Sequence, residues 1–281
     1  MLLRPFGATG TFQPVLGQGT WDIPEGGARL REAKAALSRG IELGMTHIDT
    51  AEMYGSGRVE EIVGDTIAGL DRSRLFLTSK VLPGNADFKG TLAACERSLR
   101  RLRVDHLDLY LLHWPSEYPI EETMRALEHL VAQGKTRFIG VSNFDLEDLQ
   151  AARACLRSAP LACNQVLYHL RERAIEVRLM PYCRAHDIAI VAYTPFGRGE
   201  FPVTRQERGA LENIARRHGR TARQVILNYL TRHEGTFAIP KASQRAHVEE
   251  NAGGQGWYLD ANDVAAIDAA FPVRDGPLAT L

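Results

Sequence analysis

The sequence of 281 residues has little of what marks several functional classes. Its 34 Lys plus Arg are balanced by 34 Asp plus Glu, so no excess positive charge is available to neutralise nucleic-acid phosphates or an anionic membrane surface. Its apolar runs fall far short of the roughly 20 residues that span a bilayer, and its N-terminus lacks the apolar core of a signal peptide. These absences predict a cytoplasmic protein with no nucleic-acid or membrane partner.

Cysteine is scarce, and several common motifs are missing. The four cysteines form no C-x-x-C pair, and a chain of this length can bury a core without disulfides, so free thiols are expected. The sequence contains no G-x-x-x-x-G-K-[ST], G-x-G-x-x-G or H-E-x-x-H motif. The simplest ATPase, Rossmann dehydrogenase and zinc-protease interpretations are thereby excluded.

What the chain does have is a regular alternation of short apolar runs and longer amphipathic stretches, which predicts repeated βα units. Strands are expected at residues 15–16, 46–49, 75–80, 107–113, 138–142, 162–166, 188–193 and 237–239. Helices are expected near 28–43, 58–69, 89–103, 121–133, 145–157, 172–186, 205–232 and 245–252. The even spacing and the absence of a linker predict an α/β fold, a single (β/α)8 TIM barrel domain over residues 1–281.

Three local signals refine this prediction. Gly219 followed by Thr221, a good N-cap, should split the long stretch 205–232 into two helices. Residues 3–12 read as an N-terminal hairpin, and Asp260 should cap an added C-terminal helix over 260–271.

Polar residues end three neighbouring predicted strands. Asp49, Lys80 and His113 close the second, third and fourth strands, and barrels of this kind carry their catalytic groups at those ends. Tyr54 follows on a loop that Gly55 makes adaptable. Taken singly, Asp49 could be a helix cap, His113 a satisfied core histidine and Tyr54 a packing residue. Their coincidence at adjacent strand ends favours a shared catalytic role.

These four side chains suit proton delivery without a metal. A phenol, with a pKa of about 10, is a poor acid at neutral pH unless a cation stabilises its anion. Lys80 can supply that cation, and a buried Lys needs a counter-ion such as Asp49. His113 can donate a hydrogen bond to a substrate carbonyl. The set predicts protonation of an oxygen while another agent attacks the carbon.

Eight blocks of the sequence, in order, resemble the aldo-keto reductases, nicotinamide-dependent enzymes built on the (β/α)8 barrel. They are GQGTW (17–21), HIDTAEMYGSGRVEEIVG (47–64), LFLTSK (75–80), DHLDLYLLHWP (105–115), GKTRFIGVSNF (134–144), NQVLY (164–168), AYTPFGRG (192–199) and IPKASQRAHVEEN (239–251). The pattern looks closest to bacterial methylglyoxal or diketogluconate reductases. It implies NADPH-dependent reduction of small aldehydes and ketones to alcohols by a tetrad of Asp49, Tyr54, Lys80 and His113, with Tyr54 as the general acid.

The resemblance also implies a cofactor site. It assigns the nicotinamide carboxamide to Ser142, Asn143 and Gln165, the ring face to Tyr193, the pyrophosphate to the loop of Phe196, Gly197 and Arg198, and the adenosine end to Lys241, Ser243, His247, Glu250 and Asn251. The alternative for Asn143 is an N-cap of the helix that begins near residue 145. His247 stands where many members have Arg, which replaces a permanent charge by one that depends on pH. NADPH is therefore favoured, and use of NADH stays open.

By the same likeness, the substrate pocket is lined by Trp21, Met53, Leu82 and Trp114. The segments expected to close it, 115–120 and 273–281, are short. An open pocket is predicted, suited to small carbonyl substrates such as methylglyoxal-like dicarbonyls, aromatic aldehydes and sugar aldehydes. The protein is expected to be a monomer or a weak oligomer.

Three other functions compete with this interpretation. Lys80 could form a Schiff base in an aldolase-like barrel, but Asp49 would favour its charged, unreactive form. A non-catalytic, nicotinamide-binding regulatory subunit of the same fold would have no need of Tyr54. A metal-dependent hydrolase would need clustered ligands, and of nine histidines only His113 clearly ends a strand, so no metal is expected.

Overall fold

The fold, seen in a computed structural model that describes residues 1–199 and 202–280, is built around one eight-stranded parallel sheet. Its strands run in chain order and are β3 (Gln18–Gly19), β4 (His47–Asp49), β5 (Phe76–Val81), β6 (Leu107–Leu112), β7 (Thr136–Ser142), β8 (Leu161–Leu167), β9 (Ala189–Tyr193) and β10 (Thr236–Ala238). The two edges meet, because Gly17 N donates to Ala238 O at 2.8 Å and Ala238 N donates to Val15 O at 2.9 Å. The sheet is therefore a closed barrel, as the sequence predicted.

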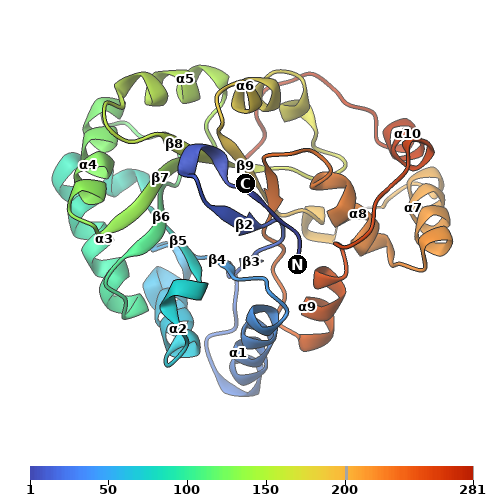
Figure 1. Ribbon diagram of the computed structural model, residues 1–281, viewed down its shortest axis with the longest axis horizontal. Coiled ribbons are helices and arrows are strands. Elements are labelled where there is room, and N and C mark those ends of the chain that lie inside the picture. The colour runs from blue at the N-terminus through green and yellow to red at the C-terminus, as the bar shows by residue number, and fades with distance from the viewer. Residues whose placement is uncertain (200–201, 281) are drawn as a thin grey trace.

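Helices surround the barrel (Figure 1). They are α1 (Gly27–Glu42), α2 (Arg58–Ile67), α3 (Phe88–Leu102), α4 (Ile120–Ala132), α5 (Leu146–Cys155), α6 (Leu179–Ala185), α7 (Arg205–His218), α8 (Ala222–Leu230), α9 (Arg245–Ala252) and α10 (Ala261–Ala270). Short 3-10 turns include η2 (Tyr54–Gly57), η4 (Pro83–Asn85), η5 (Ala174–Glu176) and η6 (Gly197–Gly199). No helix in the described part of the chain is long and apolar enough to cross a membrane.

Most predicted elements are confirmed within a few residues, including the break at Gly219 and the caps of Thr221 and Asp260. Two are not. The first strand is β3 rather than 15–16, because Val15 and Leu16 contact β10 while the residues after them pair with β4. The helix expected over 172–186 starts only at α6, because Pro181 has no N–H and tolerates helix only within its first turn.

The N-terminal hairpin pairs β1 (Leu3–Pro5) with β2 (Phe12–Pro14) and lies across one end of the barrel in Figure 1. Phe6, between the two strands, is fully buried and packs against His47, Phe76 and Phe237, which lie at or near the starts of their strands. The amino ends of the strands are thus plugged by aromatic side chains. The carboxyl ends of the strands are at the opposite end of the barrel, which is therefore the end that can hold a site.

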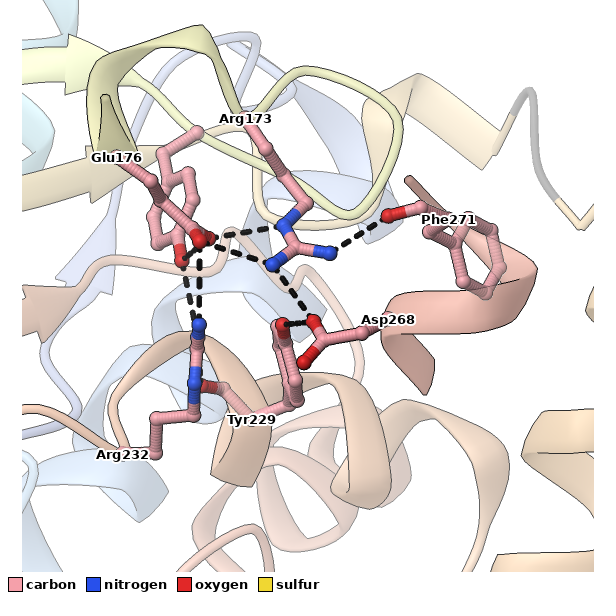
Figure 2. A network of polar contacts seen from close by, with 7 residues as sticks. Arg173, Glu176, Tyr229, Arg232, Asp268 and Phe271 are labelled. Carbon is pink, nitrogen blue, oxygen red and sulfur yellow. Dashed lines mark hydrogen bonds and ion pairs between the residues drawn. The ribbon is translucent and has the colours of Figure 1, made fainter. Parts of the chain in front are cut away.

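A buried polar network fastens the added C-terminal helix to the barrel (Figure 2). The Arg173 guanidinium donates to Glu176, to Asp268 of α10 and to the Phe271 carbonyl, and Arg232 donates to the second oxygen of Glu176. The Arg173 side chain is only 3% exposed, so a missing partner would leave a costly unpaired charge. The network fixes α10 against the loop that follows β8.

Candidate active site

A pocket of about 240 Å³ opens at the carboxyl ends of the strands. Its volume is small for the whole of a dinucleotide but adequate for a small ligand next to a cofactor ring. It is lined by Gly19, Thr20, Trp21, Asp49, Met53, Tyr54, His113, Trp114, Ser142, Asn143, Gln165, Tyr193, Thr194, Arg198, Ile239 and Lys241. Most of the site residues predicted in the sequence analysis therefore line one pocket.

A buried ion pair lies beneath this pocket, with Asp49 among its lining residues and Lys80 below them. Lys80 Nζ lies 2.6 Å from Asp49 Oδ1 and donates to the Thr50 carbonyl at 2.9 Å, and the two paired side chains are 0% and 2% exposed. The other oxygen of Asp49 accepts from Gln165 Nε2 at 2.7 Å, so Asp49 caps no helix. Burial alone would lower the pKa of Lys80, but Asp49 and Tyr54 together hold that pKa above its ordinary value. A charged ammonium therefore lies beneath the pocket.

Tyr54 projects over this ion pair from η2, a turn in which Gly55 and Gly57 adopt positive φ. Lys80 Nζ lies 3.3 Å from the Tyr54 hydroxyl oxygen and 5.0 Å from the ring centroid. Burial raises the pKa of Tyr54, and the Lys80 charge opposes that rise. The phenol is thus protonated at neutral pH, with a cation in place to stabilise its anion.

His113 follows β6 and also lines the pocket. Its ring meets Tyr54 edge-on at a centroid distance of 5.8 Å and stacks on Trp114 at 3.9 Å. Burial and the Lys80 charge lower the pKa of His113 to about 2, so the imidazole is neutral. Its Nδ1 is buried without a hydrogen-bond partner among the described residues.

Asn143 belongs to a second polar group, on the wall formed by β7, β8 and β9. Its Nδ2 donates to the His113 carbonyl at 3.0 Å, and its Oδ1 accepts from Tyr193 Oη at 2.7 Å. Asp145, not Asn143, caps α5, which removes the cap explanation for Asn143. Ser142 Oγ donates to the Gln165 carbonyl at 2.9 Å. These contacts fix the orientations of the Ser142, Asn143 and Tyr193 side chains.

Of the remaining cofactor residues that the resemblance implied, Arg198 and Lys241 line the pocket and the others do not. Gly197 is in η6, where its φ is 54°, and the Arg223 guanidinium covers the Phe196 ring at 4.9 Å. The adenosine block continues from Lys241, which bridges to Gly19 at the barrel closure and lines the pocket. In that block Ser243 Oγ and Asn251 Oδ1 are buried with no partner in the described chain, whereas His247 is exposed and Glu250 is half-buried.

Three of the four expected substrate residues line the pocket, and Leu82 is not among the residues that do. The resemblance assigned the loop that contains Arg198 to the pyrophosphate. The Arg198 guanidinium lies over the Trp21 ring at 4.8 Å, and Arg198 lines the pocket. The lining residues that the sequence analysis missed are Gly19, Thr20, Thr194 and Ile239; their one signal was that each lies within a few residues of a predicted strand end.

Comparison with known proteins agrees with this geometry. The sequence profile of the Aldo/keto reductase family matches residues 15–271. The chain belongs to the aldo/keto reductase family. Among curated members, it is 44% identical to methylglyoxal reductase YeaE of Escherichia coli over 95% of this chain and 94% of that protein. It is also 37% identical to glyoxal reductase of Bacillus subtilis, over 92% and 90% of the two chains.

Solved aldo/keto reductases share the fold along the whole chain. A Klebsiella pneumoniae aldo-keto reductase in complex with NADPH aligns over 100% of both chains at a TM-score of 0.93 and 41% identity. A second K. pneumoniae structure, in complex with NADP and acetate, aligns over 99% of both chains at a TM-score of 0.91 and 41% identity. Membership of this family makes the chain an oxidoreductase with an α/β barrel fold.

Proposed function

We propose that this aldo/keto reductase reduces small aldehydes and ketones to alcohols with NADPH, and that Tyr54 is the general acid. The observation that carries the proposal is the position of the Tyr54 hydroxyl, 3.3 Å from a buried ammonium group beneath an open pocket. Relatives named methylglyoxal reductase and glyoxal reductase support small dicarbonyl substrates. The pocket volume, about 240 Å³, suits such compounds, aromatic aldehydes and sugar aldehydes.

The chemistry divides between cofactor and protein. Bound NADPH supplies a hydride to the carbonyl carbon. As the carbonyl π bond breaks, the oxygen gains negative charge, and the Tyr54 O–H gives it a proton to complete the alcohol. Lys80 stabilises the resulting phenolate, and Asp49 keeps Lys80 charged. Water then returns a proton to Tyr54.

His113 orients the substrate in this scheme. A neutral imidazole can donate one hydrogen bond to the carbonyl oxygen without competing as a proton donor. Because Nδ1 is buried, Nε2 would be the nitrogen that donates to the substrate. The raised pKa of Lys80 argues against a Schiff-base role, which would require a neutral amine.

The residues present fit NADPH at both ends. Buried polar atoms without partners in the described chain, Ser243 Oγ and Asn251 Oδ1, offer hydrogen bonds at the adenosine end. The exposed Lys241 would hold the 2′-phosphate. At the other end the Tyr193 ring would stack on the nicotinamide, and the polar atoms of Ser142, Asn143 and Gln165 would orient its carboxamide.

Replacement of Lys241 by alanine tests the phosphate assignment. We expect the Kd for NADPH to rise about tenfold or more, because a hydrogen bond to a charged group contributes about 1.5–3 kcal/mol. The Kd for NADH, which lacks the phosphate, should not change. Quenching of tryptophan fluorescence measures both. Lys241→Arg, which keeps the charge, should retain most of the preference, and an equal loss of both cofactors would contradict the assignment.

The function itself is tested by NADPH consumption at 340 nm. The purified protein would be assayed with methylglyoxal, 4-nitrobenzaldehyde, glyceraldehyde and a keto-sugar. We expect turnover that depends on the carbonyl compound, fastest with the small dicarbonyl or the aromatic aldehyde. If no carbonyl compound is turned over while NADPH still binds, the result contradicts the proposal and favours a nicotinamide-binding regulator or a protein of very narrow specificity.

A further inference from the structure

Glu52 is a buried carboxylate outside the pocket lining, two residues before Tyr54. Its side chain is 5% exposed. One oxygen accepts from Leu82 N at 2.8 Å and from Asn85 Nδ2 at 2.9 Å, and the other lies 3.1 Å from Arg97 Nη2 of α3. A charge this deeply buried persists only with such a full set of donors. The contacts join elements that are far apart in sequence.

Those elements carry the two central groups of the site. Glu52 lies on the loop from β4 to η2, which presents Tyr54, and its own N–H donates to the Lys80 carbonyl at 3.3 Å. Leu82, which Glu52 holds, comes two residues after Lys80, where β5 runs into η4. The carboxylate therefore clamps the end of the strand bearing Lys80 to the loop bearing Tyr54.

The Tyr54 turn is held by local backbone bonds, in which Tyr54 N donates to Ala51 O and Ser56 N donates to Met53 O, each at 3.1 Å. Gly55, Ser56 and Gly57 all have positive φ, and the glycines leave the turn free to adopt other conformations. The Tyr54 ring contacts His113 edge-on, and its hydroxyl lies 3.3 Å from Lys80 Nζ. The contacts of Glu52, two residues earlier in the chain, add a restraint that is anchored at the end of β5 and not in the helix layer alone.

We propose that Glu52 is a positioning residue of the reductase site, one that holds the Tyr54 hydroxyl at its working distance from Lys80. The inference rests on the proposed function of Tyr54 and deepens it. Leu82, which the resemblance placed in the substrate pocket, instead supplies a backbone N–H to Glu52 where the chain turns into η4.

Glu52→Ala is the informative variant. Because a displacement of about 1 Å can cost on the order of 100-fold in rate, we expect kcat to fall by about 10- to 100-fold while the Kd for NADPH is unchanged. Glu52→Gln keeps an oxygen for Leu82 N and Asn85 and should recover most of kcat. The matched control is Asp108→Ala, since Asp108 is also buried, also accepts from a backbone N–H, that of Leu77, and also pairs with arginine, but lies at the start of β6.

A readout independent of turnover is the ¹³Cζ NMR signal of Tyr54, assigned by its loss in Tyr54→Phe. That signal should shift in Glu52→Ala and stay in place in Asp108→Ala. If the wild type reduces carbonyls but Glu52→Ala matches Asp108→Ala in kcat and in the Tyr54 signal, the positioning role is wrong and the reductase function stands. If the wild type reduces nothing, the function is wrong, and the NMR signal still decides whether Glu52 positions Tyr54.

Discussion

Tyr54→Phe is expected to lower kcat for carbonyl reduction by about 10³-fold, within the range of roughly 10²–10⁴ that a positioned general acid contributes. The substitution removes one oxygen and leaves the ring, whose edge contact with His113 is at a centroid distance of 5.8 Å. The loss should therefore appear in kcat, with little change in stability. Absorbance at 340 nm, at saturating NADPH, measures it.

The pH profile of the wild type provides the control for this assignment. Burial raises the pKa of Tyr54, so its protonated form persists across neutral pH. The pKa of His113 is lowered to about 2, so this group does not titrate in the working range. The reduction rate should stay level through neutral pH and fall only above about pH 10, where an ordinary phenol ionises. A Tyr54→Phe variant with wild-type kcat would remove Tyr54 from the chemistry.

The sequence predicted the barrel and the grouping of four site residues because both follow from simple geometric rules. Parallel strands finish at one edge, so Asp49, Lys80 and His113, at the ends of β4, β5 and β6, had to converge. Tyr54 could be added because its loop is short. None of these inferences needed a side-chain conformation.

The contacts that hold these residues in place could not be predicted in the same way. Gln165 donates to Asp49 from 116 positions away, and Glu52 meets Arg97 across 45 positions. No periodicity links such pairs, and a Glu in a polar loop ordinarily faces water. The predicted start of the helix at residue 172 was wrong for a local reason. The apolar pattern continues across Pro181, and such a pattern does not reveal that proline lacks an N–H.

Lys80→Met separates the structural from the catalytic use of the ion pair. The change leaves Asp49 charged, 1% exposed and without its cation, so we expect the free energy of unfolding to fall by about 3–5 kcal/mol. It also removes the cation that stabilises the Tyr54 phenolate, so kcat should fall by about 10²-fold or more. Urea denaturation and the 340 nm assay measure the two effects.

The double variant Asp49→Asn with Lys80→Met distinguishes the two causes. Replacing both charges removes the unpaired carboxylate, and pairs exchanged in this way often lose little stability. The neutral Asn can still accept from Gln165 Nε2, which lies 2.7 Å from the present Asp49 oxygen. Stability should therefore recover most of the way, whereas kcat should remain as low as in Lys80→Met, because no cation faces the phenol. Recovery of both stability and kcat would mean that the ion pair serves only to stabilise the fold. Tyr54 would then need no neighbouring charge to act as an acid.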